Sequence, residues 1–314
     1  QAGKGTVLWD DPYNLSGIGT TGSLAANRLA KEADLVIGVG TRMGDFTTCS
    51  KWLFQNPACR FLSINVASFD AYKMNAEPIV ADAKLTLAAA NRALGAAGYQ
   101  SSWGGAVEKA RADWKAEVDR LYTEEDPAGL SQARCLGELN DVLLPKNAVV
   151  VSGSGSIPSD MQRVWRTRVA GTYHMEYGFS CMGYEIAGGL GAKMAAPDRD
   201  VYVMVGDGSY LMLSSEIVTS IQEGYKLIIV LLDHHGYKSI GALSRSLGQA
   251  GFGTRYAYRE DGVLPGDNVA TVETLPVNLA ANARSLGAHV IECVGYDDFT
   301  AALHAARATD RTTV

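Results

Sequence analysis

The sequence lacks any long hydrophobic run, and this absence argues against a membrane-spanning helix. No apolar stretch approaches the roughly 20 residues that cross a bilayer, and the first residues show neither the charge pattern nor the apolar core of a signal peptide. An excess of positive charge is also missing. The formal net charge of −6 gives no electrostatic reason to expect nucleic acid or an anionic membrane as a partner.

Paired cysteines are missing as well. The five cysteines are scattered along the chain without a CxxC spacing: Cys49, Cys59, Cys135, Cys181 and Cys293. An odd, unspaced set is typical of reduced core thiols and argues against a disulfide framework or a zinc site. We therefore expect a cytoplasmic protein.

What the chain does contain is a repeated alternation of short apolar runs and helical patterns. The runs predict buried parallel strands at residues 34–40, 61–66, 148–152, 201–205, 227–232 and 290–294. Helical patterns lie among them at residues 23–33, 81–94, 133–144, 183–194 and 214–223. The expected fold class is α/β, with right-handed crossovers, parallel sheets and ligands at the carboxyl ends of the strands.

The chain divides into three segments. Residues 1–98 form a central α/β domain that has few strands and is incomplete, residues 99–130 a linker with a charged helix at 107–122, and residues 131–314 a second α/β domain. The chain starts with Gln1 and runs directly into an extended-looking segment. This start fits either a trimmed disordered tail or a chain that begins inside a domain, and the composition does not choose between them.

One glycine-rich motif indicates a phosphate site. Gly206, Asp207, Gly208 and Ser209 follow the predicted strand at 201–205, and a helix is predicted after them. A carboxylate and bare backbone N–H groups at this edge, together with the positive end of a helix, suit a diphosphate and a divalent cation. The next predicted strand ends in polar residues at 233–236, which should lie beside the motif.

A second glycine motif is a poorer candidate. Residues 17–22 match the dinucleotide pattern GxGxxG and precede a helix. However, no apolar strand leads into them, and no acidic residue ends a following strand at the expected distance. We interpret these glycines as sites of close packing between a helix and a loop.

The phosphate motif resembles the cofactor signature of thiamine-diphosphate enzymes. In that family the second oxygen ligand, normally Asn, lies twenty-seven residues after the Asp, which is position 234 here. Residues 176–194 look like the segment that holds the aminopyrimidine ring, and residues 153–157 like the other diphosphate-contacting strand end. The wider sequence is similar to the trihydroxycyclohexane-dione hydrolases of myo-inositol catabolism at residues 1–5, 39–48, 173–178 and 232–237.

The resemblance implies a role for each residue of the site, with thiamine diphosphate and Mg²⁺ as cofactors. The expected cofactor-binding residues are Gly153, Gly155, Ser156, Ile157, Ser180, Met182, Gly206, Gly208 and Ser209. The expected metal ligands are Asp207, His234 and Gly236. Met182 would hold the cofactor in its bent shape, although it could instead be a plain core residue. His235 and Tyr237 are candidates for catalytic or substrate contacts, with simple surface positions as the alternative.

The implied activity is hydrolysis of a cyclic diketone. By resemblance, the enzyme cleaves the bond between the two ketone carbons of trihydroxycyclohexane-1,2-dione and yields 5-deoxy-glucuronate. It is expected to be a homodimer or homotetramer with the active site at the subunit interface. The alternatives are an acetolactate-synthase-like lyase, a 2-oxoacid decarboxylase, or a non-catalytic α/β binding or scaffold fragment.

Two features depart from the family pattern. His234 stands where an oxygen donor is expected, so we expect weakened Mg²⁺ affinity or a shift toward a softer ion such as Mn²⁺. Asp233 would not replace it, because successive strand residues point to opposite faces. The chain also has no segment that matches the family's first domain, which supplies the activating Glu. We therefore expect a fragment that is inactive without that domain.

Overall fold

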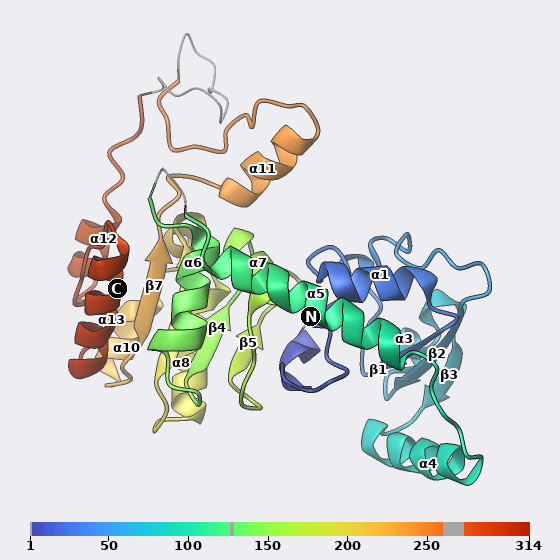
Figure 1. Cartoon of the computed structure of the whole chain (residues 1–314). Helices are drawn as coiled ribbons and strands as arrows, with labels where there is room; N and C mark the ends of the chain where they lie inside the picture. The colour runs from blue at the N-terminus through green and yellow to red at the C-terminus, as the bar shows by residue number, and fades with distance from the viewer. Residues whose placement is uncertain (1, 126–128, 260–272) are drawn as a thin grey trace. The chain divides into compact units, whose positions relative to one another are not determined.

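The structure is a computed structural model that describes residues 2–125, 129–259 and 273–314, in two compact units (Figure 1). The first unit comprises Trp9–Arg120 with Gln162–Val164. The second comprises Ala2–Leu8, Leu121–Met161 and Trp165–Val314. Both units are built on parallel strands, so the predicted α/β class is confirmed. Within the described ranges, no helix combines the length and the apolar character needed to cross a bilayer.

The first unit contains a three-stranded parallel sheet in the order β1-β2-β3. Its strands are β1 (Leu35–Val39), β2 (Arg60–Asn65) and β3 (Glu77–Val80). Its helices are α1 (Leu24–Glu32), α2 (Asp45–Thr48), α3 (Ser68–Ala71), α4 (Ala83–Ala96) and α5 (Gly104–Tyr122), with a 3₁₀ turn at Lys73–Asn75. The strands predicted at 34–40 and 61–66 are present. Strand β3 was not predicted, because it is short and contains Pro78, which argues against a strand.

Local side-chain bonds set the helix starts of this unit. The Ser23 hydroxyl accepts a hydrogen bond of 3.0 Å from the Ala26 amide, and Asp82 caps α4 in the same way. In the GxGxxG motif, Gly19 has φ of 97°. A Cβ atom there would lie 2.0 Å from the Phe46 carbonyl oxygen. This glycine therefore permits close backbone packing, as the sequence indicated.

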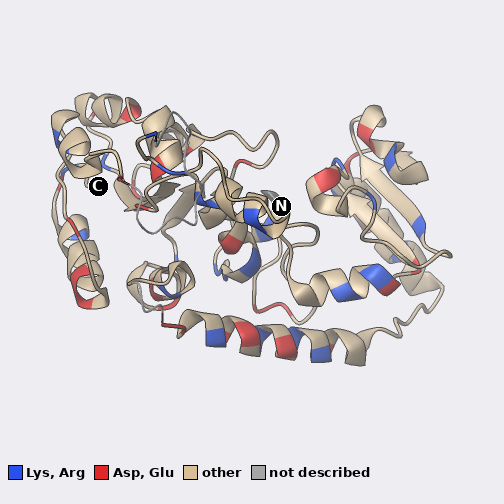
Figure 2. Ribbon diagram, turned by 90° about the horizontal axis from the view of Figure 1, so that it is seen from above, with Lys and Arg blue, Asp and Glu red and all other residues tan. Residues whose placement is uncertain are grey.

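Helix α5 carries charges of both signs along its length. Figure 2 shows acidic and basic residues alternating on it. Lys109 and Asp113 form an ion pair of 2.9 Å, and Lys115 and Asp119 one of 2.8 Å. Both pairs are exposed, so each contributes little to stability. The helix is a solvated element, as expected for the charged segment.

The second unit contains a four-stranded parallel sheet in the order β5-β4-β6-β7. Its strands are β4 (Val149–Ser152), β5 (Tyr173–Met175), β6 (Val201–Gly206) and β7 (Ile228–Leu232). Strand β5 was not predicted because it has only three residues. The strand predicted at 290–294 is wrong. Instead of a strand, the described residues show an isolated bridge between His289 and Thr313 and a hydrogen bond of 3.0 Å from the Ile291 amide to the Val314 carbonyl, because the partner segment, residues 312–314, is very short.

The helices of the second unit are α6 (Gln132–Gly137), which continues as a π-helical turn at Glu138–Leu143, α7 (Ser156–Val164), α8 (Tyr184–Ala195), α9 (Asp207–Met212), α10 (Glu216–Gln222), α11 (Lys238–Ser246), α12 (Leu279–Ser285) and α13 (Tyr296–Ala308), together with a 3₁₀ turn at Ala2–Gly5. The helices predicted at 133–144, 183–194 and 214–223 are present as α6 with its π-helical turn, α8 and α10, whereas α7, α11, α12 and α13 were not predicted. Helix α7 ends in residues that belong to the first unit.

The core of the second unit lies between its sheet and helices α8, α10 and α12. Val151 of β4 and Val203 of β6 are fully buried among side chains of these helices. A Cβ atom on Gly189 of α8 would lie 2.3 Å from a methyl carbon of Val203, so this small-residue helix approaches β6 closely. All the residues of β4 and the first five of β6 are buried, which explains their continuous apolar sequences.

Candidate functional site

The carboxyl ends of β4 and β6 lie side by side, and each leads into a helix. Helix α7 begins at Ser156 and α9 at Asp207, directly after the paired strands β4 and β6. Gly155, which precedes α7, has φ of 118°, and a Cβ atom there would have open space around it. The backbone conformation, and not crowding, therefore requires glycine. Two helix starts with free N–H groups at one sheet edge can bind an anion.

Asp207 is the buried carboxylate of this edge, with an exposed fraction of 1%. Its Oδ1 accepts a hydrogen bond of 3.0 Å from the Gly208 amide, and its Oδ2 one of 2.7 Å from the Gly236 amide. Burial raises the pKa of Asp207 to about 6, although these bonds oppose the rise. The carboxylate is therefore fixed between the ends of β6 and β7.

A tight turn follows β7. The Asp233 carboxylate accepts a hydrogen bond of 2.8 Å from the His235 amide, and His235 has φ of 54°. A Cβ atom on Gly236 would lie 2.2 Å from the Thr254 carbonyl oxygen, so this position requires glycine. The strand alternation used to exclude Asp233 as a ligand does not apply at this position. Asp233 is close enough to contribute to the raised pKa of Asp207, because β7 ends at Leu232 and its alternation of faces stops there.

His234 lies beside the end of β6. Its Nδ1 atom is 4.0 Å from the place that a Cβ atom would take on Gly206. Burial and the positive charge of Lys238 lower the pKa of His234 to about 4, although Asp233 opposes this. At neutral pH the side chain is therefore an uncharged imidazole, which offers a nitrogen donor and not an oxygen donor.

Met182, a predicted cofactor contact, and Tyr237, a predicted substrate contact, both pack against Gly208. A Cβ atom there would lie 2.8 Å from the Tyr237 ring and 3.4 Å from the Met182 methyl carbon. Ile157 of α7, which is 1% exposed, comes within 3.8 Å of the corresponding position on Gly206. The structure thus gathers Met182, Tyr237 and Ile157 around the predicted phosphate motif.

The sequence analysis missed Glu185, a carboxylate with an exposed fraction of 1%. Its oxygens accept hydrogen bonds from the amides of Ser154, at 3.3 Å, and Gly183, at 3.0 Å. Burial raises its pKa. A Cβ atom on Gly153 would lie 2.7 Å from this carboxylate. The available signal was an acidic residue in the first turn of an otherwise small and apolar helix start.

The remaining predicted contacts occupy the loops around this edge. The hydroxyls of Ser180 and Ser154 lie 2.8 Å apart, while the Ser156 hydroxyl donates to the Gln132 side chain at 3.3 Å. Ser209 is buried in the first turn of α9. The Glu176 carboxylate accepts bonds from the backbone amides of residues 179 and 181 and so holds the turn that carries Ser180.

These residues fit a diphosphate, because α7 and α9 begin at the same sheet edge and the space beside Gly155, before α7, is open. The donor set for a cation is mixed. Asp207 supplies a hard oxygen ligand, whereas the His234 nitrogen suits a borderline ion better than Mg²⁺. Within the described ranges, no group of three or more His, Cys, Asp or Glu side chains could hold a metal by itself. A cation here would also need backbone and phosphate oxygens.

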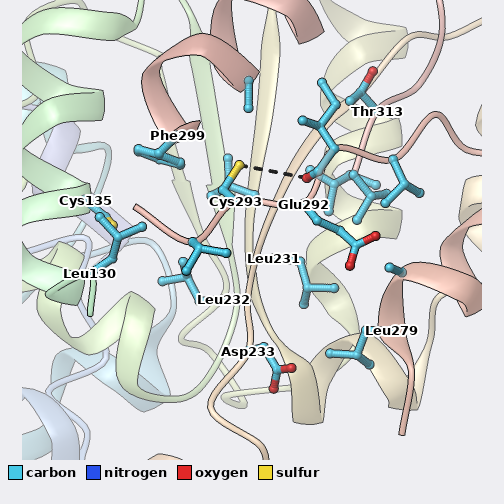
Figure 3. A pocket seen from close by; sticks show the side chains of 18 of the residues that line it. Leu130, Cys135, Leu231, Leu232, Asp233, Leu279, Glu292, Cys293, Phe299 and Thr313 are labelled. Carbon is cyan, nitrogen blue, oxygen red and sulfur yellow. Dashed lines mark hydrogen bonds between the residues drawn. The ribbon is translucent and has the colours of Figure 1, made fainter. Parts of the chain in front are cut away.

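A separate cavity of about 850 Å³ lies beside β7, between this strand and α13 (Figure 3). Its lining includes Leu232, Cys135, Phe299 and Cys293, whose thiol lies 3.9 Å from the Ile291 carbonyl oxygen. Of the predicted site residues, only His234 lines it. The cavity is therefore not the predicted cofactor site.

Comparisons with known proteins agree with this geometry. Residues 153–314 match the family model described as "Thiamine pyrophosphate enzyme, C-terminal TPP binding domain", and residues 1–90 match that of the central domain. The chain is similar to proteins named 3D-(3,5/4)-trihydroxycyclohexane-1,2-dione hydrolase. The Bacillus anthracis protein is 43% identical over 96% of this chain and 50% of its own length. The Clostridium tetani protein is 44% identical over 91% and 48%. The chain spans about half the length of these curated relatives.

Proposed function

The chain belongs to the thiamine pyrophosphate enzyme family, and on this basis we propose that the protein containing it is a thiamine-diphosphate-dependent hydrolase. Its substrate is trihydroxycyclohexane-1,2-dione, a small cyclic diketone. The bond between the two ketone carbons is cleaved, and 5-deoxy-glucuronate is released. The names of relatives that are 43% and 44% identical support this assignment.

The observation that carries the proposal is the buried Asp207 at the start of α9, held by the amides of Gly208 and Gly236. The backbone N–H groups at the start of α7, after Gly155, bind the diphosphate, and Asp207 binds the cation that neutralises it. When bound, thiamine diphosphate supplies the carbon nucleophile and holds the electrons of the broken bond. The chain's own residues orient the reactants. Met182 and Tyr237 pack beside Gly208 and exclude water from that side.

The cation ligands in this proposal are Asp207, His234 and the Gly236 carbonyl. The Asp207 carboxylate is suited to Mg²⁺. The His234 imidazole shifts the preference of the site toward Mn²⁺, which accepts nitrogen ligands more readily. Asp233, which lies near Asp207, supplies additional negative charge at the same edge.

We place the site at an interface between two copies of the protein. Apolar side chains remain exposed around the carboxyl edge, which supports this placement. In α11, Ile240, Leu243 and the adjoining Leu247 are 54%, 60% and 81% exposed, and Phe179 is 84% exposed. Figure 1 shows α11 standing above β7, away from the rest of its unit. A second copy that covers these side chains removes apolar surface from water. The five free cysteines favour a cytoplasmic location.

The test is turnover by the full-length protein. Purified enzyme is incubated with the dione, thiamine diphosphate and Mg²⁺ or Mn²⁺, and the acyclic acid is followed by mass spectrometry. The expected result is cofactor-dependent product that disappears in Asp207→Asn. Release of carbon dioxide from 2-oxo acids, with no cleavage of the dione, would indicate the lyase or decarboxylase. Failure to bind thiamine diphosphate would indicate a non-catalytic protein.

A further inference from the structure

The turn after β7 is paired with a segment that the sequence analysis assigned no role. Gly236 and Arg255 form an antiparallel bridge. The Tyr237 amide donates to the Thr254 carbonyl at 2.7 Å, and the Tyr256 amide donates to the His235 carbonyl at 3.2 Å. This pairing places the Tyr256 ring against two neighbours. Its centroid lies 5.6 Å from that of His235 and 5.9 Å from that of Tyr237, edge to face in both cases.

Two polar atoms of this aromatic group are buried without a hydrogen-bond partner among the described residues. They are the Nε2 atom of His235 and the hydroxyl of Tyr256. Tyr256 is 9% exposed, so water does not surround its hydroxyl. Buried polar groups are normally paired, because an unpaired group loses its bonds to water without compensation. Both atoms are therefore available to a ligand.

The surroundings of the pair indicate the charge of that ligand. Burial is the largest cause of the raised pKa of Tyr256, and the nearby negative charges of Asp207 and Asp233 raise this pKa further. The phenol is therefore a neutral donor, and the two carboxylates beside it disfavour an anionic ligand group that is not paired with a cation. The Tyr237 ring, which touches Tyr256, also packs on Gly208 of the phosphate motif. A neutral ligand group next to the cofactor edge fits this position.

We propose that the His235 Nε2 atom and the Tyr256 hydroxyl together bind ring hydroxyl groups of a polyhydroxylated cyclic substrate, and that Tyr256 is a specificity-determining residue. This inference rests on the proposed function. A hydroxyl group both donates and accepts, so it can satisfy an imidazole nitrogen and a phenol at once. A diketone without ring hydroxyls leaves both atoms unpaired, and a site of this kind discriminates against such an analogue.

The test compares two substrates in the full-length enzyme. Tyr256→Phe removes one oxygen and keeps the ring. We expect kcat/KM for the trihydroxylated dione to fall about tenfold, mostly through KM, while kcat/KM for cyclohexane-1,2-dione stays within about twofold. His235→Leu should likewise lower kcat/KM for the trihydroxylated dione and leave kcat/KM for cyclohexane-1,2-dione within about twofold. Equal losses on both substrates, or no loss on either, would overturn the proposal.

Tyr202→Phe is the matched control. The Tyr202 hydroxyl is also buried and unpartnered among the described residues, but Tyr202 lies near the start of β6, at the other end of the strand from Asp207. This variant should leave both substrates unchanged. A loss equal to that of Tyr256→Phe would show a general packing effect and overturn the proposal. The dissociation constant of thiamine diphosphate should be unchanged in Tyr256→Phe, which confirms an intact site.

A binding measurement separates this inference from the proposed reaction. An inosose, which is a cyclic polyhydroxylated monoketone, is titrated calorimetrically into the cofactor-loaded wild type and Tyr256→Phe. Binding that is about tenfold weaker in the variant supports the assignment even if the dione is not cleaved. Equal binding, or no binding to the wild type, overturns it. The proposed function has its own test: absence of dione turnover by the wild type would contradict the reaction without contradicting the binding role of Tyr256.

Discussion

Strands β1 and β6 are both short and apolar, yet their side chains lie in different surroundings. In β6, Tyr202, Val203 and Met204 are fully buried. In β1, Leu35 is 45% exposed and Ile37 52%. The β6 side chains are enclosed by helices, whereas part of the β1 surface is open. An apolar run therefore predicts a strand, but it does not predict how many layers cover that strand.

The carboxyl ends of the same two strands differ as well. Strand β6 leads directly into α9, whose first residue, Asp207, is buried and bound by two backbone amides. Strand β1 leads through a loop into α2, whose first residue, Asp45, is exposed. Both positions place an acid at a helix start. Only the enclosed one holds its carboxylate in a fixed direction, so binding chemistry is expected there.

The largest expected effect is on stability, and it tests the difference in burial between the side chains of β6 and those of β1. Met204→Ala should lower the free energy of unfolding of the second unit by about 2–5 kcal/mol, because it opens a cavity in a covered core. Ile37→Ala should lower that of the first unit by less than about 1 kcal/mol, because this side chain is half exposed. Denaturant unfolding, followed by probes in each unit, measures both. Equal losses would contradict the comparison.

The next effect is the pH dependence of stability that Asp207 produces. The folded pKa of Asp207, about 6, lies above the ordinary value of 3.8, so the folded state binds this proton more tightly than the unfolded state does. Protonation of Asp207 therefore adds to the free energy of unfolding. This stabilisation is fully present below pH 3.8 and is lost as the pH rises through 6. It amounts to about 3 kcal/mol. Unfolding titrations from pH 4 to 7 should show that Asp207→Asn removes this slope. An unchanged slope would assign the pH dependence to other groups.

A third prediction compares the two acids at the helix starts. In full-length protein, Asp207→Asn should weaken Mg²⁺-dependent binding of thiamine diphosphate about a hundredfold, because a cation ligand is lost and an amide N–H₂ faces a backbone donor. Asp45→Asn should leave binding unchanged. Calorimetric titration measures both affinities. A similar loss in both variants would exclude the assignment of the cation to the β6 edge.

The smallest effect concerns the choice of cation. His234→Asn replaces the imidazole nitrogen by an amide oxygen, so the preference for Mn²⁺ over Mg²⁺ should fall about tenfold. Competitive titration followed by Mn²⁺ electron paramagnetic resonance measures the ratio. In the wild type, spin-echo modulation from a bound imidazole nitrogen should accompany Mn²⁺ and be absent in the variant. Tight Mg²⁺ binding that is identical in both proteins would show that His234 is not a ligand.

Much of the site could be predicted because its signals are local. A glycine and an acid after an apolar run indicated Asp207, and the family resemblance of residues 176–194 indicated Met182. Tyr256 could not be found in this way, because it reaches the site through the bridge between its neighbour Arg255 and Gly236, nineteen positions earlier. Glu185 also needed the structure, since its partners Ser154 and Gly183 belong to different loops. Asp233 was misplaced because strand alternation was extended past the end of β7.

The sequence by itself determined the longer buried strands, β1, β2, β4, β6 and β7, and the helices α1, α4, α5, α6, α8 and α10, because apolar periodicity acts over a few residues. The family followed from the resemblance of its motifs. The tertiary structure decided which of those strands are enclosed and which distant groups meet at the β6 edge. Burial alters the pKa values of Asp207 and His234, and burial is a property of packed layers. A local sequence pattern does not determine burial.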